Sequence, residues 1–130
     1  MKRVVSLCLV LGLVLLCFFS CGNSTFDKAV KHLEDCGLNS MEYDQEQINN
    51  IMSSISTAKY FSMDGKITRI NHCVKSQANG SLKWAYLYEF ELESDATNML
   101  RYAEVIGEYC ISSGHIVVYG NAPEIEGIEL

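Results

Sequence analysis

The stretch LKWAYLYEFEL, residues 82–92, is the clearest structural signal in this chain of 130 residues. Its even-numbered positions are all large and apolar or aromatic, and Lys83, Glu89 and Glu91 fall between them. Successive side chains of a strand point to opposite faces, so this period of two predicts a β-strand with one aromatic face. We expect helices to cover that face, and the alternative is that it forms an exposed binding surface.

Glycine turn signals place further strands around this one. Asp64-Gly65 and Asn79-Gly80 are typical of hairpins, because both central residues of a type I′ turn need positive φ. The intervening residues are rich in β-branched side chains. The sequence therefore predicts a three-stranded meander over residues 58–63, 66–76 and 82–92, with a last strand at residues 116–119.

Three amphipathic helices are predicted from apolar residues at helical spacing. The first is capped by Ser24 or Thr25 and ends near Gly37. The second begins at Asp44, with Gln47 in capping-box spacing. The third is capped by Ser94. The apolar stripes of the three helices are Phe26, Ala29, Val30 and Leu33; Ile48, Ile51, Met52 and Ile55; and Ala96, Met99, Leu100, Ala103, Ile106 and Cys110.

These elements follow the order α-α-β-β-β-α-β. Helices packed on the aromatic face of an antiparallel sheet of about four strands would form a two-layer α+β domain over residues 26–120. The remaining residues, 121–130, hold the only proline and three glutamates. We expect this acidic tail to fray.

The amino-terminal 20 residues predict export from the cytoplasm. Lys2 and Arg3 are followed by a run, residues 4–19, that is apolar except for Ser6 and Gly12. A basic start, an apolar run and small residues at its end are typical of a secretory signal peptide. The alternative is an uncleaved membrane helix, but that needs about 20 apolar residues, and residues 20–25 are mostly polar.

The end of this segment, Phe18-Phe19-Ser20-Cys21, resembles the lipobox of bacterial lipoproteins. Ser20 and Cys21 match the small residue and the cysteine of that motif, whereas Phe18 replaces its usual leucine. The resemblance covers residues 1–25. It implies that Cys21 is lipidated and becomes the mature amino terminus, that residues 22–25 form a short tether, and that the domain is held on the extracytoplasmic face of the cell membrane. The alternative is cleavage after Gly22, which would release an unanchored secreted protein.

The charge balance excludes several kinds of partner. The chain has a net charge of −6, and without Lys2 and Arg3 eight basic residues oppose sixteen acidic ones, giving −8. Nucleic-acid binding calls for clustered Lys and Arg, so no nucleic-acid partner is predicted. Anionic lipid would repel such a surface, so membrane association would depend on the lipid anchor.

Three cysteines follow Cys21, namely Cys36, Cys73 and Cys110. Each lies in an apolar pattern, which favours a small buried hydrophobic role. The rival interpretation is a disulfide, Cys73–Cys110 or Cys36–Cys110, in an oxidising compartment. Each cysteine also has a histidine nearby, but the spacing fits no common zinc motif, so we predict no metal and no cofactor.

The sequence contains no recognisable catalytic motif. Glu89, Glu91 and Glu93 alternate on the polar side of a strand, which usually means a solvated face. We therefore expect a lipid-anchored, non-enzymatic extracytoplasmic domain that binds an unknown protein or small-molecule ligand. The alternatives are a secreted, unanchored small protein stabilised by a disulfide, and a thiol- or metal-binding protein.

Overall fold

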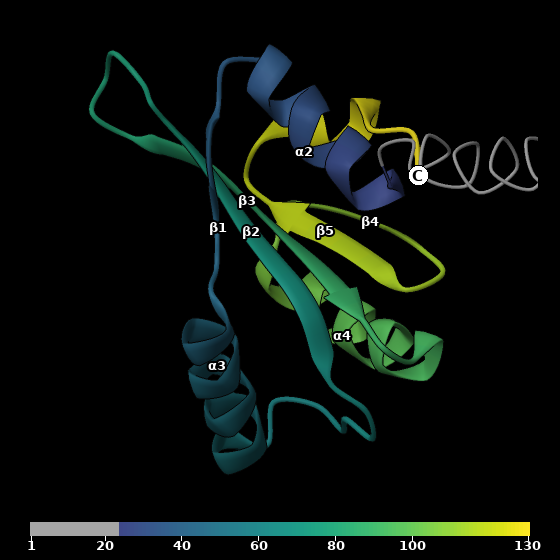
Figure 1. Cartoon of the computed structure of the whole chain (residues 1–130). Coiled ribbons are helices and arrows are strands. Elements are labelled where there is room, and N and C mark those ends of the chain that lie inside the picture. The colour runs from purple at the N-terminus through teal and green to yellow at the C-terminus, as the bar shows by residue number, and fades with distance from the viewer. Residues whose placement is uncertain (1–23) are drawn as a thin grey trace, which may run out of the picture.

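A computed structural model describes residues 24–130, so the signal segment and Cys21 lie outside the described residues. Single helices are interspersed with single strands and with two pairs of consecutive strands along the chain (Figure 1). Their order is α2 (Thr25–Asp35), β1 (Asn39–Glu42), α3 (Gln45–Ala58), β2 (Ile67–Ser76), β3 (Leu82–Phe90), α4 (Glu93–Ile106), β4 (Tyr109–Ser113), β5 (Ile116–Gly120) and the short 3₁₀ helix η1 (Pro123–Gly127). None of these helices is long and apolar enough to cross a membrane.

The five strands form one sheet in the order β1-β2-β3-β5-β4, and every neighbouring pair is antiparallel. The predicted α+β class is confirmed, with five strands instead of about four. The predicted strand at residues 82–92 is the middle strand, β3. It pairs with β2 on one side and β5 on the other, and this position explains why its aromatic row is the strongest signal in the sequence.

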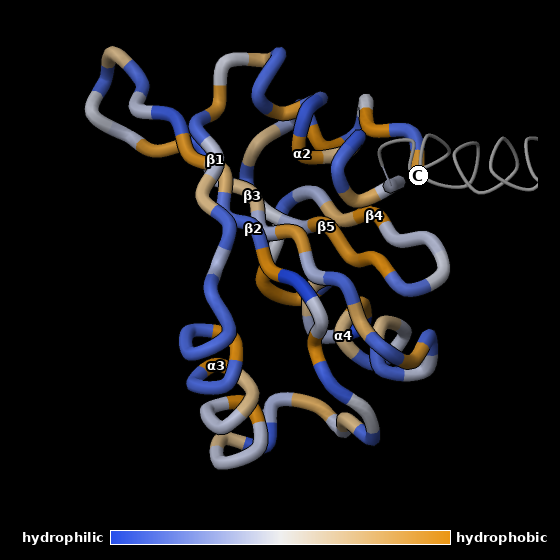
Figure 2. Tube along the Cα trace, in the orientation of Figure 1, coloured by the Kyte–Doolittle hydropathy of each residue, from blue (hydrophilic) through white to orange (hydrophobic). Residues whose placement is uncertain are grey.

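Helices cover both faces of the sheet, so the predicted two-layer arrangement is wrong. The core on one face joins α2 and η1 to Ala85 and Leu87 of β3. The core on the other face joins α3 and α4 to Tyr88 and Phe90 of the same strand. Because Ala85 and Leu87, which lie between the aromatic residues of β3, are also apolar, the second face needs cover as well. In Figure 2 most of β5 is hydrophobic, and all five of its residues are buried.

The two predicted amino-terminal helices form with their predicted caps. Ser24 and Asp27 make a capping box at the start of α2. That helix ends at Gly37, where φ is +89° and the amides of Gly37 and Leu38 donate to the Glu34 and Leu33 carbonyls, the pattern of a Schellman motif. Asp44 and Gln47 make the second capping box, at the start of α3.

The predicted strand at residues 58–63 does not form. Helix α3 runs to Ala58, and Lys59 ends it in the left-handed region with φ at 55°. β2 pairs with β3 along one edge, and along its other edge it pairs with β1 and not with the predicted strand. β1 has only four residues, which are too few for an alternating pattern to show in the sequence. Residues 59–66, which we call the crossing loop, connect α3 to β2.

Only one of the two predicted hairpin turns exists. Gly80, with φ at +82°, closes the loop between β2 and β3 by donating its amide to the Gln77 carbonyl. The turn is not type I′, since Asn79 does not have a positive φ. Asp64-Gly65 makes no hairpin, because both of its amides donate to the Asp95 carboxylate.

The region after β3 differs from the prediction at both ends of its helix. The N-cap of α4 is Leu92 and not Ser94, and no side chain caps it. The helix stops at Ile106, before Gly107, and Cys110 lies in β4. The helical spacing of Cys110 is accidental, and it concealed a short edge strand.

The acidic tail is part of the domain, contrary to the expectation that it frays. Helix η1 places Ile125, which is fully buried, in the core under α2. Ala122 and Ile128 are buried in the same core, and the Glu124 carboxylate accepts from Lys83 Nζ at 2.6 Å. The single domain therefore continues past residue 120 to the carboxyl terminus.

Candidate functional site

A small apolar cavity of about 160 Å³ lies between α3 and α4, above the sheet. Tyr88 of β3 and Tyr119 of β5 belong to the sheet below it. The rest of its lining comes from the two helices and the crossing loop: Ile51, Ser54, Ile55, Tyr60, Phe61, Met99 and Tyr102. The sheet, both helices and the crossing loop therefore all contribute to the cavity.

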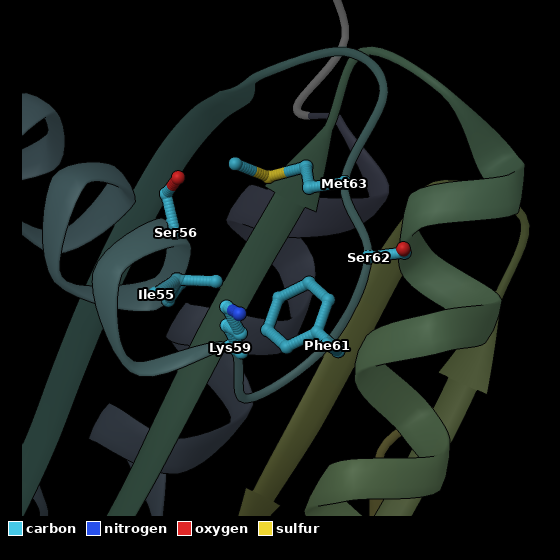
Figure 3. A pocket seen from close by; sticks show the side chains of 6 residues that line it. All are labelled: Ile55, Ser56, Lys59, Phe61, Ser62 and Met63. Carbon is cyan, nitrogen blue, oxygen red and sulfur yellow. The ribbon is translucent and has the colours of Figure 1, made fainter.

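Two wider surface pockets adjoin this cavity at Phe61. The first, about 510 Å³, opens on the α3 side and is lined by Ile55, Ser56, Lys59, Phe61, Ser62 and Met63 (Figure 3). The second, about 380 Å³, opens on the α4 side and is lined by Tyr60, Phe61, Ser62, Asn98, Arg101, Tyr102 and Val105. Because the three spaces share the Phe61 side chain, we treat them as one site and call it the groove.

The crossing loop is held against α4 by polar contacts. The amides of Asp64 and Gly65 each donate to one oxygen of the fully buried Asp95 carboxylate, at 2.8 Å. Asn98 Nδ2 donates to the Ser62 carbonyl at 3.0 Å. A Cβ on Gly65 would lie 3.1 Å from Asp95 Oδ2 and 2.9 Å from a side-chain carbon of Leu92, so this close approach favours glycine.

These hydrogen bonds between the crossing loop and α4 fix the position of Phe61. Its ring centroid lies 6.4 Å from that of Phe90, edge to face, and 6.2 Å from that of Tyr102. Tyr60, which is 54% exposed, stacks at a tilt on Tyr102 with the ring centroids 5.4 Å apart. Aromatic pairs at these distances stabilise one another, so the loop presents two rings to the groove in a defined arrangement.

The groove combines a neutral floor with a basic rim. Burial raises the pKa of Tyr88 to about 12 and also raises that of Tyr119, so both phenols stay protonated at neutral pH. Among residues 24–130, Lys59 and Arg101 are the only ones in the lining with a charge at neutral pH. Neither side chain forms an ion pair with another described residue.

A second aromatic surface lies on the same sheet face. It consists of Met41, His72, Val74, Trp84 and Tyr86, and we call it the aromatic patch. Met41 is 51% exposed and the others are half-buried. His72 stacks on Tyr86 with ring centroids 4.1 Å apart and an interplanar angle of 2°, and burial lowers the pKa of His72. The predicted helical cover of the β3 row is thus complete at Tyr88 and Phe90 and partial at Trp84 and Tyr86.

Cys36, Cys73 and Cys110 are all free thiols in the structure, which therefore contains neither of the two disulfides of the rival interpretation, Cys73–Cys110 and Cys36–Cys110. Cys73 belongs to the core under α2, whereas Cys110 packs against the core under α3 and α4. The sheet separates the two. Burial raises the pKa of Cys73 to about 12 and that of Cys110 to about 11, so both are neutral thiols, as the small-hydrophobe interpretation expects.

The structure brings together one of the three histidine–cysteine pairs noted in the sequence. His32 Nε2 lies 3.8 Å from Cys36 Sγ and 3.1 Å from the Glu124 carbonyl oxygen. Within residues 24–130 no three potential ligands gather where a metal could bind. Cys21, the predicted lipidation site, lies outside the described residues.

The alternating glutamates do not form a paired-carboxylate site. Glu89 accepts a hydrogen bond from Thr68 on β2, Glu91 follows the end of β3, and Glu93 begins α4. Their side chains therefore serve different elements. This matches the solvated face that the sequence suggested for them.

Sequence reasoning missed the groove, because its key residues lie in a segment predicted to be a strand. Lys59 and Phe61 fall in residues 58–63, whose short length gave no helical or loop signal. Asp95 was also passed over, although an acidic residue in the first turn of a helix is common. The one available signal was the Asp-Gly pair, whose free amides need an acceptor when they do not form a hairpin.

No protein-family model, no curated protein and no solved structure matches this chain.

Proposed function

We propose that this protein is a lipid-anchored, non-enzymatic binding domain on the extracytoplasmic face of a bacterial cell membrane, and that its ligand site is the groove. The lipobox-like residues at Cys21 support the anchor. The observation that carries the binding role is the aromatic-floored cavity between α3 and α4, which shares Phe61 with two larger surface pockets. Concave, mostly apolar spaces with a few polar groups are where small ligands bind.

The relation between the anchor and the groove supports this proposal. The first described residue, Ser24, lies three residues after Cys21, so the tether reaches about 10 Å at most. Helix α2, which follows, covers the sheet face opposite to the groove. A domain anchored through α2 keeps the groove accessible to ligands in the extracytoplasmic space.

The chemistry of the groove favours binding over catalysis. Its titratable groups are tyrosines together with Lys59 and Arg101, and its lining includes no histidine, cysteine or carboxylate. General acid–base catalysis near neutral pH usually needs a group whose pKa lies close to that pH. The buried phenols have pKa values moved further away from neutrality.

Metabolic labelling with an alkyne analogue of palmitate tests the anchor. The parent protein should carry the label and sediment with the cell envelope. The Cys21→Ser variant should carry no label and should leave the envelope pellet after its signal is processed. Equal retention of both proteins without label would contradict the anchor, and a mature amino terminus at Asn23 would establish the unanchored secreted form instead.

A groove-filling variant tests the binding role. Ser54 lines the cavity on α3 and is solvent-exposed on its other side. The Ser54→Trp variant should keep the fold and lose ligand binding, because the indole occupies the cavity. The matched control is Ser53→Trp, on the same helix but outside the groove lining.

A further inference from the structure

We infer that the groove binds a small amphiphilic anion, namely a carboxylate joined to an apolar body such as a phenyl ring or a short alkyl chain. This inference rests on the proposed function and names the ligand class of the same site. Two independent features carry it: the apolar cavity and the pair of unpaired cations at its rim.

The apolar part of the ligand is set by the inner cavity. Its volume of about 160 Å³ is that of a small ring or a chain of several carbons, and its lining is aliphatic and aromatic. The polar atoms that it offers are the hydroxyls of Ser54 and the neutral tyrosines. A charged group inside this cavity would lose part of its hydration without gaining an opposite charge, so the cavity favours an apolar group.

The charged part of the ligand is set by the rim. Lys59 lines the pocket on the α3 side and Arg101 the pocket on the α4 side. No Asp or Glu lines any of the three spaces, although the whole chain has sixteen acidic residues against ten basic ones. An anionic group placed beside the inner cavity, on either side of Phe61, therefore lies in a pocket that a cation lines.

The aromatic lining raises the opposite possibility of an organic cation. Ring faces attract cations through the negative charge of their π electrons. Lys59 and Arg101 would repel a bound cation from both sides of Phe61, and the lining holds no carboxylate that could offset this repulsion. The two cations and the lack of carboxylates in the lining therefore favour an anionic ligand over a cationic one.

The test compares three probes that share a 3-phenylpropyl body and differ only in the head group: 4-phenylbutyrate, 3-phenylpropan-1-ol and 3-phenylpropyl-trimethylammonium. The anchored protein is held in phosphatidylcholine nanodiscs, and empty nanodiscs correct for partition into lipid. Binding is measured by calorimetry at low ionic strength. We expect the carboxylate to bind at least tenfold more tightly than the alcohol and the ammonium compound, because a hydrogen bond to a charged group contributes about 1.5–3 kcal/mol.

Three variants identify the groups responsible. The double variant Lys59→Gln/Arg101→Gln should reduce the affinity for the carboxylate to that for the alcohol and leave the alcohol's affinity unchanged. Lys28→Gln removes an exposed cation from α2, on the other side of the sheet, and should change nothing. Ser54→Trp should abolish binding of all three probes.

The possible failures are distinguishable. If all three probes bind equally and Ser54→Trp abolishes their binding, the groove is the ligand site but its preference for anions is refuted. If the ammonium compound binds most tightly, the charge argument is also refuted. If no probe binds, or if Ser54→Trp binds as the parent does, both the anion inference and the proposed role of the groove are wrong.

Discussion

Replacing Asp95 should destabilise the protein and release the crossing loop. The carboxylate is fully buried in the first turn of α4, where the helix dipole also favours a negative charge. It accepts the amides of Asp64 and Gly65 at 2.8 Å. Asp95→Ala removes both acceptors and leaves the two amides without their partner.

The loss of unfolding free energy expected for Asp95→Ala follows from these two hydrogen bonds. A hydrogen bond to a charged group contributes about 1.5–3 kcal/mol, so the pair contributes about 3–6 kcal/mol. The carboxylate itself is costly to bury, which favours the lower end, and we expect Asp95→Ala to lower the free energy of unfolding by about 3 kcal/mol. Asp95→Asn keeps one acceptor but turns an NH₂ group towards the other amide, and it should cost about 2 kcal/mol.

Urea denaturation measures this effect. With a slope of about 1.5 kcal/mol/M, a loss of about 3 kcal/mol moves the midpoint by about 2 M. Hydrogen exchange should show faster exchange at the Asp64 and Gly65 amides in both variants. Asp35→Asn, which breaks an exposed i,i+4 ion pair with Lys31, is the control and should leave the urea midpoint nearly unchanged. Midpoints for both Asp95 variants within the range of that control would refute the reasoning.

Three further predictions concern the rest of the domain. Gly120→Ala places a Cβ 2.1 Å from a carbonyl oxygen of β3, so it should cost about 3 kcal/mol or prevent folding, and a variant as stable as the parent would contradict the β3–β5 register. Cys73 and Cys110 should remain unbridged in non-reducing mass spectrometry and react with a thiol reagent at pH 8 only after unfolding; a bridge between them would contradict the placement of the two thiols on opposite faces. The hydrogen bond from Arg69 lowers the pKa of Asp27 below its ordinary 3.8, so the stability that this carboxylate contributes is present above that pH and is lost as the pH falls below it. Arg69→Met should weaken this acid dependence in denaturation curves recorded between about pH 5 and pH 2, and an unchanged slope would contradict the role of the pair.

The elements that could be predicted from the sequence are those with strong local patterns. The aromatic alternation of β3, the cap at Ser24 and the capping box at Asp44 each depend on neighbouring residues, and each is confirmed. The elements that could not be predicted depend on distant partners. Strand β1 has four residues, and β4 is an edge strand whose Cys110 falls by chance on the stripe of α4.

The layering and the groove could not be predicted for a similar reason. The sheet face that carries Ala85 and Leu87 is covered by α2 and Ile125 together. Because α2 and Ile125 are far apart in the sequence, no local pattern shows that they pack together. The groove depends on the crossing loop, which is held to α4 by Asp95, about 30 residues further along the chain. Its cations, Lys59 and Arg101, lie on either side of Phe61 only once that loop is in place.

Methyl NMR of the anchored protein gives the most direct test of the claim that the groove is the ligand site. Met63 lines the outer pocket and Met99 the inner cavity, whereas Met41 belongs to the aromatic patch on the same sheet face. When 4-phenylbutyrate is added to protein labelled at its methionine methyl groups, the signals of Met63 and Met99 should shift and saturate together, and that of Met41 should stay in place. A saturable shift at Met41 alone would move the site to the aromatic patch and contradict the claim, as would the absence of any saturable shift.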